Sequence, residues 1–221
     1  QVDKDLAKIS NDVYPANIYT GYVPIEQEGS HIFYMLYPAR GTRDASATLN
    51  NSAPLVMWMQ GGPGCADWLG NFAEIGPLTV INTTNGVEVV KSEINWNTDY
   101  NLLFIDQPPG VGFSPAGNVT YTDSIQAGKT VVQFLQDFYN VYPSLKSSPF
   151  YIFGESYAGH YIPSVASQLV ATKSKTGINL AGVGIGNGLT DPPRQGAGYA
   201  QFGFMAGFID SRLKASIVPL E

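Results

Sequence analysis

The sequence predicts an α/β protein in which a central, mostly parallel sheet carries helices on both faces. Three continuous apolar runs, at 54–60, 101–108 and 150–156, are bounded by Pro, Gly or Asn, as is typical of strands buried on both faces. A helical pattern lies between the second and third runs, and another follows the third. Strands that alternate with helices in this way favour a parallel sheet.

Two strands are expected before these runs and one after them. The segments 17–25 and 31–38 are rich in β-branched and aromatic residues and are expected to pair with each other. The apolar segment 178–187 is expected to form the last strand. The pattern therefore predicts about six strands, and the run at 150–156 is the fifth of them.

The helices follow from apolar periodicity and from the residues that flank it. The first is expected to begin near Thr122 and Asp123 and to end before Pro143. The second is expected to follow Ser156 and to reach about Lys173. The apolar positions of the first helix are Ile125, Val132, Leu135, Tyr139 and Tyr142.

The alternation of strands and helices stops after the sixth strand. The segment 191–210, DPPRQGAGYAQFGFMAGFID, follows neither pattern and resembles the start of an insertion. We therefore expect residues 1–190 to form the core of the fold and residues 191–221 to begin an inserted cap.

Composition excludes several classes of function. The formal net charge is −6 and no cluster of Lys and Arg is visible, which makes nucleic acid and anionic membrane surfaces unexpected partners. No apolar run approaches the ~18 residues of a membrane span. The single Cys and two distant His residues offer no metal-ligand spacing, and no phosphate-binding loop is present, so no metal or cofactor is expected.

Asn50, Asn82 and Asn118 begin acceptor sequences for N-glycosylation, each in polar, loop-like sequence. They suggest a glycoprotein of the secretory route, either secreted or in an acidic compartment of the lysosome or vacuole type. In that setting the lone Cys65 points to a partner outside the chain or to a free thiol. A small buried residue that only packs is an equal alternative.

The segment 150–163, FYIFGESYAGHYIP, places Ser156 between an expected strand and an expected helix. This context is typical of a nucleophile elbow, in which small residues flank a strained turn that exposes the serine. Gly154 fits the Gly-x-Ser-x-Gly pattern, whereas Ala158 stands where the last glycine is expected.

A base for Ser156 is harder to find. His31 precedes the serine, whereas this type of fold supplies its histidine last in chain order. His160 lies on the helix that leads away from the serine, so we expect it to be a buried, hydrogen-bonded structural residue. Asp191 and Asp210 come too early to be the acid of a triad.

Oxyanion donors are easier to identify. The residue after the nucleophile, Tyr157, would supply one backbone N–H. The loop 60–64, QGGPG, follows an apolar strand, and its glycines would let a second N–H approach the site. A simple Gly/Pro turn is the alternative for this loop.

Five blocks in order resemble the serine carboxypeptidases of the α/β-hydrolase fold: WMQGGPGC, FAEIGP, NWNTDYNLLFIDQPPGVGFS, GESYAGHYIP and GIGNGLTDP. The similarity runs from about Tyr14 to Pro192. The resemblance implies that Ser156 is the nucleophile and that Gly62 and Tyr157 are the oxyanion donors. It also implies a subsite for the substrate's C-terminal carboxylate, made of Gln60, Gly61, Glu74 and Glu155.

Two departures from the family pattern concern this subsite. Gln60 stands where the family often has Asn, which keeps the amide. Cys65-Ala66-Asp67 replaces the usual Cys-Ser-Ser, and we expect Asp67 to add a negative charge near the site. If Glu74 and Glu155 lie close together in space, they cannot both ionise without a large cost in free energy. One of them is therefore expected to hold a proton, and activity is expected to favour acidic pH.

The resemblance also accounts for the missing triad members. The family's Asp and His lie beyond the inserted cap, so a second chain or a C-terminal half would supply them, linked through Cys65. The expected activity is removal of C-terminal residues from peptides. The alternatives are acyl transfer on the same residues and a non-catalytic binding or stabilising role.

Overall fold

The computed structural model describes residues 3–7, 14, 17–26, 29–41, 49 and 52–220. Its contacts divide the chain into two compact units, Gln1–Gly188 and Leu189–Glu221. The division falls close to the boundary expected after residue 190. The assignment of the second unit to an inserted cap stays a prediction.

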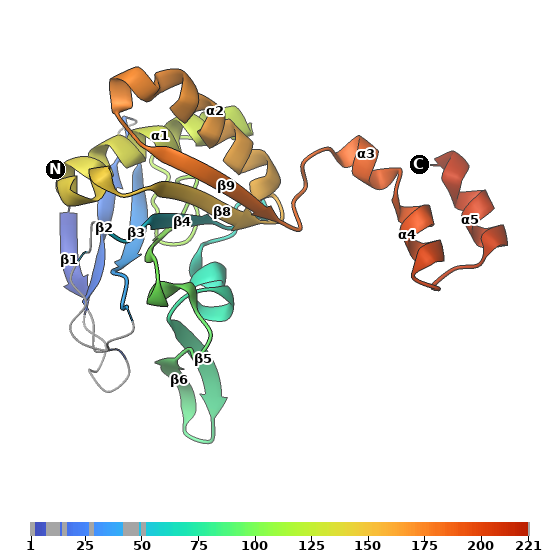
Figure 1. The fold of residues 1–221 in the computed structure, drawn as a ribbon, viewed down its shortest axis with the longest axis horizontal. Helices are drawn as coiled ribbons and strands as arrows, with labels where there is room; N and C mark the ends of the chain where they lie inside the picture. Colours follow the sequence, from blue (N-terminus) through green and yellow to red (C-terminus); the bar gives the residue numbers. More distant parts are fainter. Residues whose placement is uncertain are drawn as a thin grey trace. The chain divides into compact units, whose positions relative to one another are not determined.

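In the larger unit, seven strands of the described residues form one sheet in the order β1-β2-β3-β7-β4-β8-β9 (Figure 1). Strands β7, β4, β8 and β9 run parallel to one another, and β1 to β3 extend the sheet in antiparallel fashion. A central parallel sheet was predicted and is confirmed. The strands are β1 Asp3–Ala7, β2 Ile18–Pro24, β3 His31–Tyr37, β4 Leu55–Met59, β7 Asn101–Ile105, β8 Phe150–Glu155 and β9 Leu180–Gly186.

The sequence analysis missed strand β1 and a two-stranded hairpin. The hairpin consists of β5 (Leu78–Thr83) and β6 (Gly86–Lys91) and projects from the larger unit (Figure 1). Its residues are mostly exposed, so it lacks the apolar run by which the buried strands were found. The dipeptide Asn85-Gly86 at its tip is a common hairpin signal that would have identified it.

The two long helices pack together on one face of the sheet. Helix α1 (Ser124–Val141) begins at Asp123, whose side chain accepts a hydrogen bond from Gln126 N at 2.8 Å. Helix α2 (Ala158–Thr176) ends at Gly177, which adopts a left-handed conformation. The cap at Asp123 lies where the sequence predicted it, and α2 is three residues longer than expected.

Alternation along β4 divides its side chains between two hydrophobic clusters. Leu55, Met57 and Met59 face the cluster that includes the buried residues of α1 and α2. Val56 and Trp58 face a second cluster with Ile75 and Leu78. On that second face, the helical cover among the described residues consists of two short elements, η1 (Gly70–Glu74) and η2 (Trp96–Thr98). The ring of Trp96 in η2 packs against those of Trp58 and Phe153.

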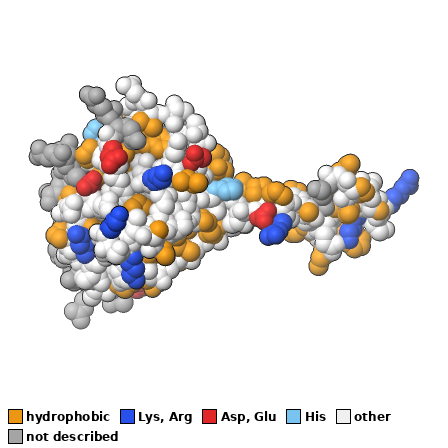
Figure 2. Space-filling model, turned by 90° about the horizontal axis from the view of Figure 1, so that it is seen from above, with side chains coloured by type: hydrophobic (Ala, Val, Ile, Leu, Met, Phe, Trp, Pro, Cys, Tyr) orange, Lys and Arg blue, Asp and Glu red, His pale blue; other side chains and the backbone are white. Residues whose placement is uncertain are grey.

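The smaller unit consists of short helices. Ala200 is its one buried residue among those described, and most of its large apolar side chains are exposed to solvent, as Figure 2 shows for the smaller lobe. Exposed residues include Tyr199, Phe202, Met205 and Phe208. Its helices are α3 Pro192–Gly196, α4 Tyr199–Met205, α5 Ser211–Ile217 and η4 Val218–Leu220; the larger unit also contains η2 Trp96–Thr98 and η3 Pro143–Ser147.

Candidate active site

Ser156 lies at a sharp turn between β8 and α2, as the sequence predicted. Its φ angle is +62°, a left-handed value that costs a non-glycine residue about 1–3 kcal/mol. The turn is held by two hydrogen bonds, from Ser156 N to Gly186 O and from Gly159 N to Ser156 O, both at 3.0 Å. The side chain is half-buried, so the turn presents it at the carboxyl edge of the parallel strands.

The alanine at position 158 is accommodated by the glycine at position 154. A Cβ on Gly154 would lie 2.8 Å from the Cβ of Ala158 and would also collide with the carbonyl oxygen of Met59. Because Gly154 has no side chain, the methyl group of Ala158 is fully buried without distorting the turn. The looser match to the elbow pattern therefore does not disrupt the elbow.

The loop 60–64 packs directly against this turn. A Cβ on Gly61 would lie 2.5 Å from Tyr157 N and 2.8 Å from the Cβ of Ser156, so only glycine permits this approach. Gly62 has a φ of +110°, and a Cβ there would lie 2.8 Å from Cys65 N. The two predicted oxyanion donors thus come from segments that are in contact.

The polar side chains predicted for the carboxylate subsite also meet. Gln60 Nε2 donates a hydrogen bond to Glu155 Oε2 at 3.2 Å. Glu74 lies near the same amide and near Glu155. Partial burial and the charge of Glu155 raise the pKa of Glu74, while its interaction with the Gln60 side chain lowers it. The structure thereby brings Gln60, Gly61, Glu74 and Glu155 together beside Ser156.

Trp58 is a residue of this site that the sequence analysis missed. Its Nε1 donates to Gln60 Oε1 at 2.9 Å, which leaves the Nε2 group of the same amide to face the glutamates. Trp58 and Gln60 lie on the same face of one strand end, two residues apart. That spacing was the signal in the sequence.

Asp67 lies near the site, where we expected it to add a negative charge, but it is buried and not open to a substrate. Only 2% of the residue is exposed. Its Oδ1 accepts a hydrogen bond from Gln60 N at 2.6 Å, and its Oδ2 accepts one from Ile105 N at 3.0 Å. Burial raises the pKa of this carboxyl well above its usual value. Asp67 therefore joins two strand ends instead of facing the solvent.

Neither histidine is placed to act on Ser156. His31 begins β3 and its Nδ1 lies 3.4 Å from Gly29 O. His160 is half-buried on α2, and its ring packs against that of Tyr157 with centroids 4.8 Å apart. This differs from the buried, hydrogen-bonded role that we expected. In the described part of the chain, neither imidazole is hydrogen-bonded to the serine.

A hollow of about 250 Å³ lies beside the elbow, between the glycine loop and the start of α1. Tyr157 and Tyr161 form one side of it, and Gly64 N donates to the hydroxyl of Tyr161 at 3.3 Å. Pro108 adds apolar surface, and Thr122, Asp123 and Ser124 before and at the start of α1 add polar groups. The hollow therefore combines aromatic and apolar surface with polar groups.

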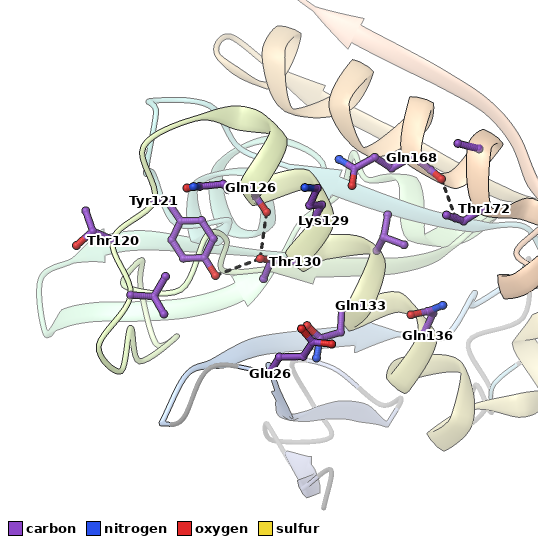
Figure 3. A pocket seen from close by; sticks show the side chains of 13 residues that line it. Glu26, Thr120, Tyr121, Gln126, Lys129, Thr130, Gln133, Gln136, Gln168 and Thr172 are labelled. Atoms are coloured by element: carbon purple, nitrogen blue, oxygen red, sulfur yellow. Dashed lines mark hydrogen bonds between the residues drawn. The ribbon is translucent and has the colours of Figure 1, made fainter.

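A larger groove of about 600 Å³ runs along α1 and α2 (Figure 3). Amide and hydroxyl side chains line it, and the hydroxyls of Tyr121 and Thr130 are 3.1 Å apart. None of the predicted site residues borders this groove. The size of a hollow is thus a poor guide to the chemistry of this protein.

The remaining predicted positions are on the surface or outside the described residues. Cys65 is exposed and unpaired in the described chain. Asn118 is exposed in a loop, whereas Asn82 is exposed within strand β5 and not in the loop that we expected. Asn50 lies outside the described residues.

The described residues offer neither a cluster of metal ligands nor a membrane-spanning helix. No group of three or more His, Cys, Asp or Glu residues in the described ranges could hold a metal ion. No described helix is both long and apolar enough to cross a membrane.

Comparisons with known proteins agree with the fold and with the motifs. The profile of the serine carboxypeptidase family matches residues 9–218. Carboxypeptidase Y homolog A of Arthroderma otae is 39% identical over 188 residues, which are 85% of this chain and 32% of that protein. The Neurospora crassa protein of the same name is 40% identical over 177 residues, or 80% of this chain and 30% of that protein.

Among solved structures, the chain is similar to Kex1(delta)p, a prohormone-processing carboxypeptidase from Saccharomyces cerevisiae. The TM-score is 0.76 at 26% identity, and the match covers 92% of this chain and 44% of that one. This likeness confirms the predicted α/β-hydrolase fold. The chain spans about a third of the length of the curated relatives it matches. It belongs to the serine carboxypeptidase family.

Proposed function

We propose that this chain carries the nucleophile, the oxyanion donors and the carboxylate subsite of a serine carboxypeptidase. The observation that carries the proposal is the contact between the strained turn at Ser156 and the glycine loop. Gly61 can approach Tyr157 N only because it lacks a Cβ, and the amide of Gln60 bonds Glu155 next to the serine. One small region thus combines a nucleophile with groups that suit an oxyanion and a terminal carboxylate.

The reaction follows from these placements. Ser156 Oγ attacks the carbonyl carbon of the last peptide bond and gives its proton to a histidine base. The N–H groups of Gly62 and Tyr157 stabilise the oxyanion of the tetrahedral intermediate. The C-terminal residue leaves with a proton from the same base, and an acyl-enzyme remains on Ser156. Water then hydrolyses this ester and regenerates the serine.

The Gln60 amide and a protonated Glu74 would donate hydrogen bonds to the substrate's terminal carboxylate. An ionised Glu74 would repel that group, so activity should favour acidic pH. The aromatic hollow beside Tyr157 would receive the penultimate side chain of the peptide. Peptides with free C-termini are the proposed substrates.

The base and its orienting acid are proposed to come from the remaining part of the enzyme. The edge strand β9 exposes Val183 and Ile185, and the second unit exposes several aromatic side chains. Exposed apolar surfaces of this kind are expected where another part of the enzyme packs against them. The exposed Cys65 is the proposed disulfide link to that part. Two exposed sequons, at Asn82 and Asn118, and the prohormone-processing relative support a glycoprotein of the secretory route or an acidic compartment.

The proposal is tested on the complete enzyme with a fluorophosphonate, which labels activated serines. We expect one adduct on the peptide that contains Ser156, and none in a Ser156→Ala variant. The intact mass should fall on reduction by the mass of a second chain that is joined to this one by a disulfide at Cys65. A complete, folded enzyme that forms no adduct and releases no C-terminal residue would overturn the proposed function. A labelled enzyme whose mass is unchanged by reduction would overturn only the disulfide.

A further inference from the structure

The buried carboxyl of Asp67 joins the carboxyl ends of two adjacent strands. It accepts hydrogen bonds from Gln60 N, at the end of β4, and from Ile105 N, at the end of β7. The first of these bonds is 2.6 Å long and the second is 3.0 Å long. Asp67 therefore fixes the backbone position of Gln60 relative to the rest of the sheet.

The environment of Asp67 makes this arrangement costly unless its hydrogen bonds are kept. Burial raises the pKa of the carboxyl, the hydrogen bonds from Ile105 N and Gln60 N lower it, and the neighbouring carboxyls of Asp106 and Glu74 raise it again. Asp106 is itself held in place, because its oxygens accept bonds from Asp67 N at 3.0 Å and Phe113 N at 2.8 Å. A buried acid in an acidic neighbourhood is retained only where its partners are well placed.

The geometry continues from Asp67 to the carboxylate subsite. Asp67 holds the backbone of Gln60, and Trp58 holds the Oε1 atom of its side chain. Because the amide is planar, these two contacts also set the direction of Nε2, which donates to Glu155 beside Ser156. We propose that Asp67 is a positioning residue, which sets the amide of Gln60 for recognition of the substrate's C-terminal carboxylate. The inference rests on the proposed function.

The test compares Asp67→Ala with Asn101→Ala in the complete enzyme. Asn101 is the matched control because its buried side chain also joins chain segments beside β4 and β7, but at their amino ends. Each variant is assayed on a peptide with a free C-terminal carboxylate and on the same peptide with a C-terminal amide. We expect Asp67→Ala to lower the ratio of the two kcat/KM values roughly 10- to 100-fold, chiefly through KM.

Two further readouts separate positioning from general damage. Fluorophosphonate labelling of Ser156 should change at most a few-fold in Asp67→Ala, because the elbow and the glycine loop are also held by bonds that do not involve this carboxyl. These run from Ser156 N to Gly186 O and from Cys65 N to Gly61 O. Asp67→Asn, which keeps one accepting oxygen, should restore part of the selectivity. Asn101→Ala should lower Tm by about as much as Asp67→Ala does, while its selectivity ratio stays at the native value.

The outcomes are distinguishable. If the native enzyme does not release C-terminal residues, the proposed function fails and this inference fails with it. If the native enzyme is active and the selectivity ratio of Asp67→Ala equals the native ratio, the inference alone is overturned. This holds whether the variant keeps its activity or loses activity equally on both substrates, in which case Asp67 has only a structural role.

Discussion

The two ends of strands β4 and β7 are anchored by different chemistry. At the amino ends, the neutral amide of Asn101 accepts a hydrogen bond from Ala39 N at 2.9 Å and donates one to Ala53 O at 3.1 Å. At the carboxyl ends, the carboxyls of Asp67 and Asp106 accept the backbone N–H bonds instead. All three anchoring side chains are buried.

This difference separates stability from chemistry along the same strands. An amide satisfies buried backbone groups equally well at every pH, so the amino ends add stability without an electrostatic cost. Buried carboxyls are costly, and here they lie next to the glycine loop, the elbow and the two glutamates. Changes at the carboxyl ends should therefore alter activity, and changes at the amino ends should alter stability.

The largest effect is expected for Gly61→Ala at the carboxyl end. The new methyl group would lie 2.5 Å from Tyr157 N and would force the loop away from the elbow. Because the oxyanion donors come from these two segments, we expect kcat/KM to fall about 100-fold or more. Fluorophosphonate labelling and peptide hydrolysis measure the loss, and circular dichroism should show an unchanged fold.

The control for this variant is Gly196→Ala. A Cβ at Gly196 meets no atom within 4 Å, so activity should stay at the native level. If Gly61→Ala retained native activity, the close approach of loop and elbow would not be required for the reaction. The contrast between the two strand ends would then lose its strongest support.

An intermediate effect is expected for Asn97→Ala near the amino end of β7. The Asn97 side chain accepts from Tyr14 Oη at 2.8 Å and donates to Pro38 O at 2.8 Å. Removing this buried amide leaves its partners unsatisfied, so we expect a loss of about 2–3 kcal/mol in the free energy of unfolding. Denaturant titration measures it, and kcat/KM well below Tm should change less than a few-fold.

Asn85→Ala, at the exposed tip of the hairpin, is the comparison for Asn97. Its stability should stay within about 0.5 kcal/mol of native. A large activity loss in Asn97→Ala under conditions where the variant remains folded would contradict the proposed separation of roles.

The sequence predicted those parts of the molecule in which local pattern determines structure. The runs at 54–60, 101–108 and 150–156 became β4, β7 and β8 because a strand buried on both faces must be apolar throughout. The elbow at Ser156 was predicted for the same reason, since a turn between strand and helix needs small neighbours. Secondary structure near the site was therefore within reach of the sequence.

The role of Asp67 was not within reach. Its partners at Gln60 and Ile105 lie on two strands, so the contact exists only after the loop beyond β4 folds back over the strand ends. No local pattern distinguishes an acid buried in this way from a solvated one. For Asp106 there was a signal, because it directly follows a buried strand, where a polar residue marks the functional edge of a parallel sheet.

The smallest effect, and the sharpest test of the acidic end, is expected for Glu74→Gln. Partial burial and the charge of Glu155 raise the pKa of Glu74 above its ordinary value of 4.5. The folded enzyme therefore keeps this proton to a higher pH than a free glutamate would. The hydrogen bond from the protonated acid to the substrate's carboxylate is present at low pH and is lost as pH rises through the raised pKa.

Gln keeps the donor at every pH, so Glu74→Gln should flatten the fall in kcat/KM between acidic and neutral pH by a few-fold. The effect should appear for peptides with a free C-terminal carboxylate and be absent for the same peptides with a C-terminal amide. Glu93→Gln, an exposed glutamate after the hairpin, should keep the native profile. If kcat/KM of Glu74→Gln fell as steeply with rising pH as that of the native enzyme, the pH dependence would have another origin, such as the histidine base. The acidic end of the strands would then act through geometry alone, as Asn101 does at the other end.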